Sequence, residues 1–316
     1  MSQISGVVCT YNRCESLRET VASLTAQRLG EGLTLEIVVI DNNSTDHTPR
    51  IVQEAEKASR WPIRYVPEPV QGVAHARNRA LESARGEYIA FVDDDALAEP
   101  TWAEAIARCF HDTGADLVGG KVEPLWLTER PGWLSDELMG PIMAVDFGPQ
   151  RKRCASGETF LTTNCALRRA SLGRYGGFDA SLGRRGRRWI GGEDVELCRR
   201  WLARGAHVVY EPAAVVKHKV EAARVTPEFY RRWFEDIGYT QAHQLTEKWH
   251  YRLSVLPAWR WKTLLAAGAQ YASTRGRGDD AGRFRAQLWW LFERSFLRER
   301  MDHWLGKRRC RFADAE

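Results

Sequence analysis

Short strand-like runs alternate with amphipathic segments through the first 92 residues of this chain. The strand-like runs occupy residues 4–9, 35–40, 63–66 and 87–92. Between the first two, Leu17, Val21 and Leu24 recur at helical spacing. Alternating strand and helix patterns are typical of a parallel, doubly wound sheet covered by helices on both faces. We therefore expect an α/β fold in the first part of the chain.

The pattern loosens after residue 98, but both element types continue. We predict helices over 99–110 and 194–203, strands over 116–121 and 206–210, an apolar segment over 160–167, and an irregular stretch over 124–159. From Thr226 onward only helical patterns appear. This change predicts an α/β domain over residues 1–222 and a helical region over 223–316.

Charge and tryptophan are unevenly distributed along the 316 residues. Residues 217–316 hold 20 Lys and Arg against 12 Asp and Glu, together with seven of the 13 Trp. Residues 1–216 hold 26 basic and 29 acidic residues. The first two-thirds therefore resemble a near-neutral enzyme body. The last third is basic and aromatic, which is typical of segments that seek surfaces.

The cysteines and the hydropathy pattern favour a cytoplasmic protein. The seven Cys are spread out without a CxxC pair, which argues against a zinc cluster or a disulfide framework. The start, Met1-Ser2-Gln3-Ile4, lacks the pattern of a secretory signal. The most apolar stretch, near 253–272, is interrupted by Arg260 and Lys262, so we expect no membrane-spanning helix.

Three adjacent carboxylates, Asp93, Asp94 and Asp95, follow the apolar run Tyr88-Ile89-Ala90-Phe91-Val92. Acids this close repel one another at low dielectric unless a positive charge lies beside them. An oxygen-only cluster suits Mg²⁺ or Mn²⁺ better than zinc or copper. Open α/β sheets bind ligands at the carboxyl ends of their strands. The alternative is a solvated acidic turn that caps the following helix.

The first strand is followed by side chains rather than by a glycine-rich phosphate loop. It ends in Thr10-Tyr11-Asn12-Arg13, and the second strand ends at Asp41. A nucleotide held here would need an aromatic face and a carboxylate that accepts from a base N–H. The alternatives are that Tyr11 is a core aromatic and that Asp41 is a turn residue.

Two arginines, Arg77 and Arg79, occur on the helix predicted over 72–83. Residues two apart on a helix point in different directions, so we expect at most one to face the strand ends. Arg77 shares a face with Val73, Ala74 and Leu81, which favours Arg77 for the site and a surface position for Arg79.

A second acidic pair, Glu193-Asp194, opens the helix predicted over 194–203 after Gly191-Gly192. Helix dipoles favour acids at this end, and that effect alone explains one of the two. A general base needs a carboxylate within reach of a substrate hydroxyl, and the glycines leave room for one. His218, just after the last predicted strand, is either structural or a ligand.

Taken together, these motifs resemble the family 2 glycosyltransferases, which are inverting enzymes with the GT-A fold. The resemblance keeps its order over residues 3 to about 220 and rests on five segments: Thr10-Tyr11-Asn12-Arg13, Asp41-Asn42-Asn43-Ser44-Thr45-Asp46, Ala76-Arg77-Asn78, Asp93-Asp94-Asp95 and Gly191-Gly192-Glu193-Asp194. It implies a Rossmann-like mixed, mainly parallel sheet flanked by helices, with a helical C-terminal region.

The resemblance also implies roles for individual residues. Thr10, Tyr11, Asn12, Arg13 and Asp41 would line the nucleotide pocket, and Arg77 would hold the sugar or phosphate side. The triplet resembles the family's DxD motif: Asp93 and Asp94 would face the donor, and Asp95 would bind the Mn²⁺ or Mg²⁺ that bridges the diphosphate. His218 matches an additional metal ligand of some members. Asp194 would be the general base, with Glu193 beside it.

The function implied is transfer of a sugar from a nucleoside diphosphate donor, by family habit a UDP-sugar, to an acceptor hydroxyl. The metal would stabilise the departing diphosphate as a Lewis acid, and attack opposite the leaving group would invert the anomeric centre. The acceptor would be a saccharide or a lipid-linked glycan in bacterial polysaccharide or glycolipid assembly. The enzyme would work in the cytoplasm, with peripheral contact to the inner face of the plasma membrane.

The last third lies beyond the resemblance and has two interpretations. Phe229, Trp233 and Ile237 share one helical face, and further Trp and Phe residues flanked by Arg follow over 255–312. The helices either rest on an anionic membrane or pack on the catalytic domain. For 226–250 we favour packing. The arginines alternate with bulky apolar residues, which argues against nucleic-acid binding.

Two rival functions are consistent with such a sheet. A sugar-phosphate nucleotidyltransferase would carry a glycine-rich loop with Arg and Lys after the first strand, and residues 9–13 contain none. A non-catalytic, glycosyltransferase-like scaffold would not need both Asp95 and Asp194. The sugar, the base, the acceptor and the oligomeric state are not specified by these motifs.

Overall fold

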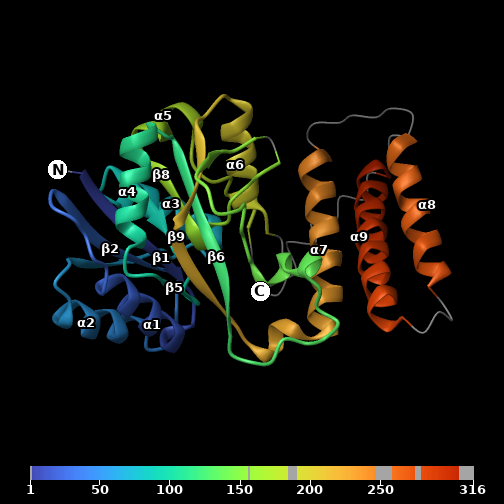
Figure 1. Cartoon of the computed structure of the whole chain (residues 1–316), viewed down its shortest axis with the longest axis horizontal. Coiled ribbons are helices and arrows are strands. Elements are labelled where there is room, and N and C mark those ends of the chain that lie inside the picture. The colour runs from blue at the N-terminus through green and yellow to red at the C-terminus, as the bar shows by residue number, and fades with distance from the viewer. Residues whose placement is uncertain (1, 156, 184–190, 247–257, 275–278, 306–316) are drawn as a thin grey trace. The chain divides into compact units, whose positions relative to one another are not determined.

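The fold was analysed in a computed structural model, which describes residues 2–155, 157–183, 191–246, 258–274 and 279–305. The chain forms two compact units. The first contains Met1–Leu127, Ile142–Gly183 and Glu193–Val220, and the second contains the described residues of Thr128–Pro141, Arg184–Gly192 and Glu221–Glu316. Figure 1 shows the sheet of the first unit and the three long helices of the second.

The N-terminal half of the sheet is parallel, as the alternating pattern predicts. Its strands are β1 (Ser2–Thr10), β2 (Leu33–Asp41), β3 (Ile63–Pro67) and β4 (Tyr88–Phe91), in the order β3-β2-β1-β4. The helices between them are α1 (Cys14–Thr25), α2 (Thr48–Ala58) and α3 (Val73–Ser83). Each parallel pair requires such a crossover, which places the helices on the faces of the sheet.

The other half makes the sheet mixed. It contains β5 (Ala96–Ala98), β6 (Leu117–Trp126), β7 (Lys152–Arg153), β8 (Cys165–Arg168) and β9 (Val208–Val220). β8 lies antiparallel between β4 and β6, β6 pairs parallel with β9, and β5 and β7 add to β9 antiparallel. The predicted mixed α/β sheet flanked by helices is confirmed. The predicted end of the last strand at residue 210 is wrong, because β9 continues to Val220 through pairing with β6 and β5.

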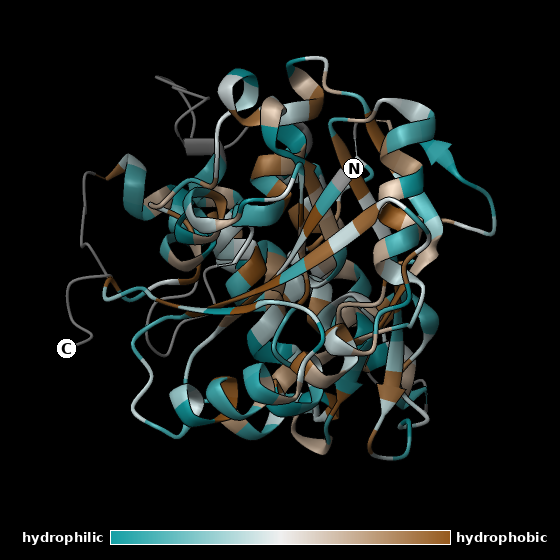
Figure 2. Ribbon diagram, turned by 90° about the vertical axis from the view of Figure 1, so that its left-hand side faces the viewer, coloured by the Kyte–Doolittle hydropathy of each residue, from teal (hydrophilic) through white to brown (hydrophobic). Residues whose placement is uncertain are grey.

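Neighbouring residues of β2 belong to two hydrophobic layers, one on each face of the sheet. Ile37 and Val39 lie in the layer that contains residues of α1 and of α4 (Trp102–Thr113). Val38 and Ile40 lie in the layer that contains residues of α3 and of α6 (Glu193–Ala203). Side chains alternate between faces along a strand, so a continuous apolar run serves both layers. Figure 2 shows stretches of hydrophobic residues in brown along the ribbon of the strands.

The second unit is built from α7 (Pro227–Thr246), α8 (Ala258–Ser273) and α9 (Asp280–Trp304). In Figure 1 the three helices stand side by side with α9 in the middle. The buried face of α7 carries Tyr230, Phe234 and Ala242. The residues that the sequence places on one helical face, Phe229, Trp233 and Ile237, are half-buried. The side chain of Trp259 is not among those that the structure describes.

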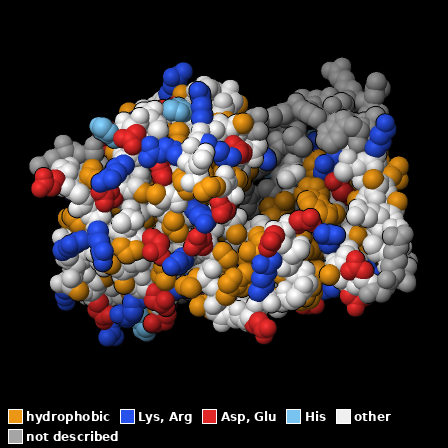
Figure 3. Space-filling model, in the orientation of Figure 1, with side chains coloured by type: hydrophobic (Ala, Val, Ile, Leu, Met, Phe, Trp, Pro, Cys, Tyr) orange, Lys and Arg blue, Asp and Glu red, His pale blue; other side chains and the backbone are white. Residues whose placement is uncertain are grey.

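The first unit presents a surface of mixed charge, and the second exposes several apolar side chains. On the face shown in Figure 3, basic and acidic side chains are interspersed over the first unit. Within the second unit, Trp261, Leu265 and Trp304 are exposed apolar residues. Among the described helices, none is both long and apolar enough to cross a bilayer.

Candidate active site

The carboxyl ends of β1, β2 and β4 bring the predicted donor-side residues together. Thr10 and Asp41 are direct partners in the parallel register of β1 and β2. β4 lies on the other side of β1, and its chain continues into Asp93, Asp94 and Asp95. Parallel strands end at the same edge of a sheet, so residues about 30 and 80 positions apart in the sequence become neighbours there.

Asp94 and Asp95 are buried, Asp93 is half-buried, and all three carboxylates have partners, so the triplet is not a solvated turn. Asp94 accepts hydrogen bonds from Thr10 Oγ1 at 2.7 Å and from Arg13 Nη1 at 3.1 Å, and Asp95 accepts from Arg13 Nη1 at 2.9 Å. Burial raises the pKa of Asp94 to about 7, and the cation of Arg13 limits the rise while Asp95 adds to it. The alternative of a solvated capping turn is therefore wrong.

Asp41 and Asn12 organise the loops that follow β1 and β2. Asp41 accepts from Ser44 N at 2.8 Å and from Tyr65 Oη at 2.6 Å. Asn12 adopts a positive φ of 51°, and its side-chain oxygen accepts from Thr45 N at 2.7 Å. Asn and Asp tolerate this left-handed region better than most residues. Both predicted residues thus hold the loop 41–46 against the end of β1.

Tyr11 is 48% exposed, which rules out the alternative of a core aromatic. Its ring stands beyond the end of β1, next to the exposed Asn12. Tyr65 was not anticipated from the sequence. Burial, followed by the hydrogen bond to Asp41, raises the pKa of Tyr65 well above its usual range, so the phenol stays a donor. An aromatic residue in β3 carries no distinctive signal without the register of β2 and β3.

His218 lies inside β9 rather than after the last strand, which corrects the predicted position. It pairs with Ala96 of β5, directly after the triplet, and its Nε2 lies 3.3 Å from Asp95 Oδ1. The ring is 1% exposed, and its Nδ1 has no hydrogen-bond partner among the described residues. The strand extension that the sequence analysis missed is therefore what delivers His218 to Asp95.

These two residues fit one edge of a divalent cation site. A carboxylate oxygen and an imidazole nitrogen are donors that Mn²⁺ accepts, and such ions usually keep water and substrate phosphate as further ligands. Among the described residues, no group of three or more His, Cys, Asp or Glu side chains could hold a metal by itself. A metal at Asp95 and His218 would therefore depend on oxygen atoms from a substrate and from water.

The second acidic pair lies against α3. Glu193 and Arg77 form an ion pair in which both side chains are buried, and Arg77 Nη2 lies 3.8 Å from Asp93 Oδ1. The guanidinium also packs over the Phe178 ring, 5.8 Å from its centroid. Arg79, by contrast, is exposed and pairs with Glu82. The prediction that only one of these arginines faces the strand ends is confirmed.

Asp194 lies half-buried at the start of α6. It accepts from Val195 N at 2.8 Å and from Thr162 N at 3.3 Å. Burial and the neighbouring Glu193 raise its pKa to about 7, and Arg77 opposes the rise. A carboxylate whose pKa is near neutral pH can both take and release a proton, which is the property of a general base.

A short segment missed in the sequence analysis joins the two acidic motifs. In the 3₁₀ turn Thr162–Asn164, Thr163 Oγ1 donates to Asp93 while Thr162 N donates to Asp194. Asn164 anchors this turn by donating to the carbonyls of Lys121 and Ala214, each at 2.8 Å. The sequence signal was three consecutive polar residues, Thr162, Thr163 and Asn164, inside the segment over 160–167 that the sequence analysis describes only as apolar.

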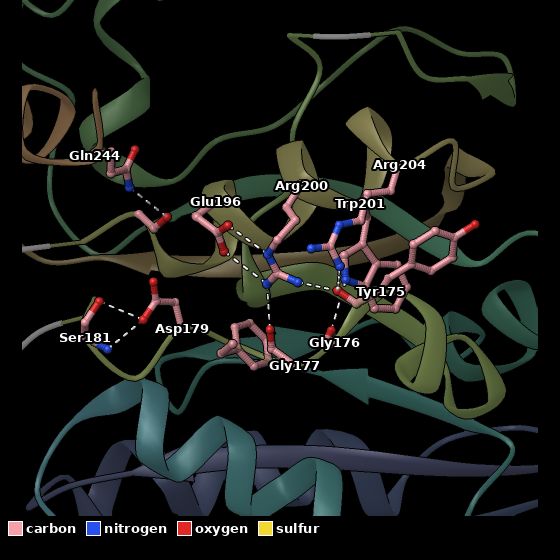
Figure 4. Close-up of polar contacts among 12 residues, drawn as sticks. Tyr175, Gly176, Gly177, Asp179, Ser181, Glu196, Arg200, Trp201, Arg204 and Gln244 are labelled. Carbon is pink, nitrogen blue, oxygen red and sulfur yellow. Dashed lines mark hydrogen bonds and ion pairs between the residues drawn. The ribbon is translucent and has the colours of Figure 1, made fainter. Parts of the chain in front are cut away.

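Arg200 connects α6 to the chain segment 175–177. Figure 4 shows Arg200 reaching from α6 to the carbonyls of Tyr175 and Gly177, and Trp201 Nε1 donating to Gly176 O at 3.1 Å. Glu196 pairs with Arg200 one turn earlier, at 2.8 Å. These contacts fix α6 on the loop after α5 (Leu172–Tyr175). By fixing α6, these contacts also help to fix its first turn, which carries Glu193 and Asp194.

The family model described as "Glycosyl transferase family 2" matches residues 5–176, more than half of the chain. This chain belongs to glycosyltransferase family 2. The chain is 30% identical over 248 residues to the succinoglycan biosynthesis protein ExoM of Rhizobium meliloti, covering 77% of this chain and 75% of that protein. It is 28% identical over 222 residues to the glucosyl-dolichyl phosphate glucuronosyltransferase of Haloferax volcanii, covering 69% of each.

Solved structures of similar fold are also glycosyltransferases. The mannosyltransferase PcManGT from Pyrobaculum calidifontis, in complex with GDP-Man and Mn²⁺, has a TM-score of 0.64 at 20% identity, covering 97% of this family 2 chain and 88% of that one. S. aureus TarS 1-349, in complex with UDP, has a TM-score of 0.55 at 18% identity, covering 96% and 92%. At these identities the likeness shows the GT-A fold.

Proposed function

We propose that this family 2 glycosyltransferase is an inverting, metal-dependent hexosyltransferase. It would move a sugar from a nucleoside diphosphate, with UDP as the first base to test, to an acceptor hydroxyl in polysaccharide or glycolipid assembly. One observation carries the proposal: Arg77 and the turn Thr162–Asn164 each contact both the Asp93 side and the Glu193-Asp194 side. A donor site and a base therefore share one edge of the sheet.

The donor would bind across the carboxyl ends of β1 and β2. The exposed ring of Tyr11 offers a face for the base. Asp41 is 2% exposed and accepts from Ser44 N and Tyr65 Oη, so a base N–H would reach it only by sharing one of these oxygens. Thr10, Asn12 and Arg13 would complete this pocket, and Asp93 and Asp94 would face the ribose and diphosphate. Asp95 and His218 would hold Mn²⁺ or Mg²⁺, which as a Lewis acid would stabilise charge on the leaving diphosphate.

Asp194 would accept the proton of the acceptor hydroxyl. Its oxygens are held by Val195 N and Thr162 N, so the carboxylate has a defined orientation. Two buried polar atoms beside it, Glu193 Oε2 and Thr162 Oγ1, have no partner among the described residues. They are the groups that would orient a hydroxyl on its way to Asp194. Attack from this side, opposite the diphosphate, would invert the anomeric carbon.

The acceptor and the place of work are proposed from the relatives and from the second unit. ExoM acts in succinoglycan biosynthesis and the Haloferax protein on a glucosyl-dolichyl phosphate, as their names state. A saccharide on a lipid carrier is therefore the acceptor class that we propose here. Peripheral contact with an anionic membrane, through the exposed apolar residues of α8 and α9, would bring the enzyme to such an acceptor.

Thermal unfolding with UDP, GDP and dTDP, each with and without Mn²⁺, tests the donor site directly. A ligand at about 100 times its Kd stabilises the folded state by about 2.7 kcal/mol, which is visible as a melting shift. We expect a metal-dependent shift with one of the three nucleotides. Transfer from the matching nucleotide sugar to a lipid-linked saccharide would then establish the reaction. No shift with any nucleotide would contradict the proposal and favour a non-catalytic scaffold.

A further inference from the structure

Arg77 was expected to hold the donor, but in the structure its guanidinium pairs with carboxylates of the protein itself. The residue is 7% exposed, and its guanidinium pairs with the buried carboxylate of Glu193. The other nitrogen, Nη2, lies 3.8 Å from Asp93 Oδ1. A guanidinium committed to two protein carboxylates has little capacity left for a phosphate, since each additional anion must compete with them.

The position of Arg77 is fixed by packing on several sides. The ring of Phe178 covers the guanidinium. The backbone of Phe178 is in turn held by Asn78, the next residue of α3, which accepts from Phe178 N at 2.9 Å and donates to Phe178 O at 2.8 Å. Arg77 is therefore a rigid bridge between α3, the end of β4 and the first turn of α6.

We propose that Arg77 is a positioning residue for the transfer step: it holds Glu193-Asp194 in register with the carboxylates after β4. This inference rests on the proposed function, because it assigns Asp194 as the base. A donor-binding arginine would contact the nucleotide sugar, whereas Arg77 in the positioning role contacts only groups of the protein. Loss of the bridge should disturb the proton transfer more than the binding of a nucleotide diphosphate.

The charges that face Asp194 from the surrounding elements allow this role to be measured. The carboxyl group beside Asp194 is that of Glu193 on α6, the cation is Arg77 on α3, and Cys165 on β8 and Cys198 on α6 are thiols with raised pKa values. Asp93 after β4 lies near Arg77, at 3.8 Å. Arg77 lowers the pKa of Asp194, whereas burial and Glu193 raise it. Removal of Arg77 should therefore move the pKa of Asp194 upward.

The first experiment measures transfer by Arg77→Met and Arg77→Lys. For Arg77→Met we expect kcat at pH 7 to fall by about 100-fold or more, the acid limb of the kcat profile to move to higher pH, and nucleotide-Mn²⁺ affinity to stay within about threefold. Arg77→Lys keeps the charge, so its acid limb should stay nearer to that of the wild type. Arg79→Met, an exposed arginine on the same helix, is the matched control and should behave as wild type.

A second arm needs no substrate. The unfolding free energies of the protein and of Asp194→Asn are compared from pH 4 to 9, in the wild-type and Arg77→Met backgrounds. An Asp whose folded pKa is raised costs stability as pH rises from its unfolded pKa to its folded pKa. We expect this loss, relative to Asp194→Asn, to level off near pH 7 in the wild type and at higher pH in Arg77→Met.

The outcomes separate the two proposals. If the stability arm behaves as expected but no donor supports transfer, the proposed function fails while the bridge stands as a structural device. If Arg77→Met loses nucleotide affinity more than tenfold while its acid limb does not move, Arg77 is a donor-binding residue and the inference is overturned. An unchanged limb with unchanged kcat overturns it as well. Should Arg77→Met not fold, Glu193→Gln breaks the same bridge from the other side: kcat should again fall, but the acid limb should move to lower pH, because Glu193 raises the pKa of Asp194.

Discussion

At the scale of single residues, carboxylates at this site differ mainly in what surrounds them. Asp94 and Asp194 both have pKa values raised to about 7, with burial as the largest cause. Arg13 contacts Asp94 directly and limits the rise of its pKa, whereas Asp194 accepts hydrogen bonds from two backbone N–H groups. The same side-chain type is thus prepared for a charged ligand in one place and for a proton in the other.

The pH dependence of transfer follows from the raised pKa of Asp194. A general base must be ionised, so kcat should fall about tenfold per pH unit as the pH drops below about 7. Asp194→Asn should lower kcat by at least about 1000-fold at every pH while nucleotide-Mn²⁺ binding stays nearly intact, because the amide cannot take the proton. Steady-state rates and calorimetry measure the two quantities. Near-wild-type turnover by this variant would remove Asp194 from the mechanism.

Asp95 is the residue on which metal binding should depend. Asp95→Ala removes the carboxylate that lies 3.3 Å from His218 Nε2. We expect the Mn²⁺-dependent part of nucleotide binding to weaken by at least about tenfold, while binding without metal changes little. Calorimetric titration with and without Mn²⁺ measures this. Asp112→Ala, which removes an exposed carboxylate that pairs with Arg151, is the control. Equal metal dependence in wild type and Asp95→Ala would exclude Asp95 as a ligand.

At the scale of elements, β6 and the turn Thr162–Asn164 show how the sheet supports the site. The register of β6 and β9 shifts between Gly120 and Lys121. A Cβ at Gly120 would lie 2.2 Å from Ala214 O and 2.3 Å from Asn164 Nδ2. Only glycine allows β9 and Asn164 to approach this closely. The close approach places Thr162 and Thr163 between the two acidic motifs.

Gly120→Ala should therefore disturb both stability and transfer. Overpacking of this kind costs about 1–3 kcal/mol of unfolding free energy, and the displaced turn should lower kcat more than nucleotide affinity. Denaturant unfolding and steady-state kinetics measure the two effects. Gly173→Ala in α5 is the matched control, since no heavy atom lies within 4 Å of its Cβ position. Equal stability of the two variants would show that β9 and Asn164 can move apart freely.

At the scale of the whole molecule, the two units differ in the kind of surface they present. The first unit has a mixed-charge surface on the face seen in Figure 3. The second exposes Leu265 to 69% and Trp304 to 56% on helices from a basic part of the sequence. Apolar side chains beside Lys and Arg are the combination by which helices bind anionic bilayers at their surface.

Vesicle flotation tests whether the second unit binds membranes. At low salt, we expect the protein to float with vesicles that contain anionic lipid, and to remain unbound with neutral vesicles. The double variant Leu265→Glu and Trp304→Glu should lose most of this binding, because it places acids where apolar side chains are exposed. Leu127→Glu, an exposed leucine of the first unit, should not. No association of the wild type at low salt would exclude a membrane role for these helices.

The sequence by itself determined the local elements and the chemical types at their ends. Short continuous apolar runs between amphipathic segments indicate strands buried on both faces. The strands β1, β2 and β4 were therefore predictable, and so was the position of Thr10, Asp41 and Asp93–Asp95 at their carboxyl ends, the edge where open α/β sheets bind ligands. The helical C-terminal region was predictable from a different pattern, because its apolar residues recur at helical spacing.

Only the tertiary structure decided which of these groups meet. The length of β9 depends on pairing with β6 and β5, and this pairing, not a local pattern, carries His218 to Asp95. The pairing of Arg77 with Glu193 joins residues 116 positions apart. Hydrophobic periodicity reports which side of an element is buried, but not the partner on the other side. Contacts between buried charges are set by the packing of whole elements, and packing is decided by the complete fold.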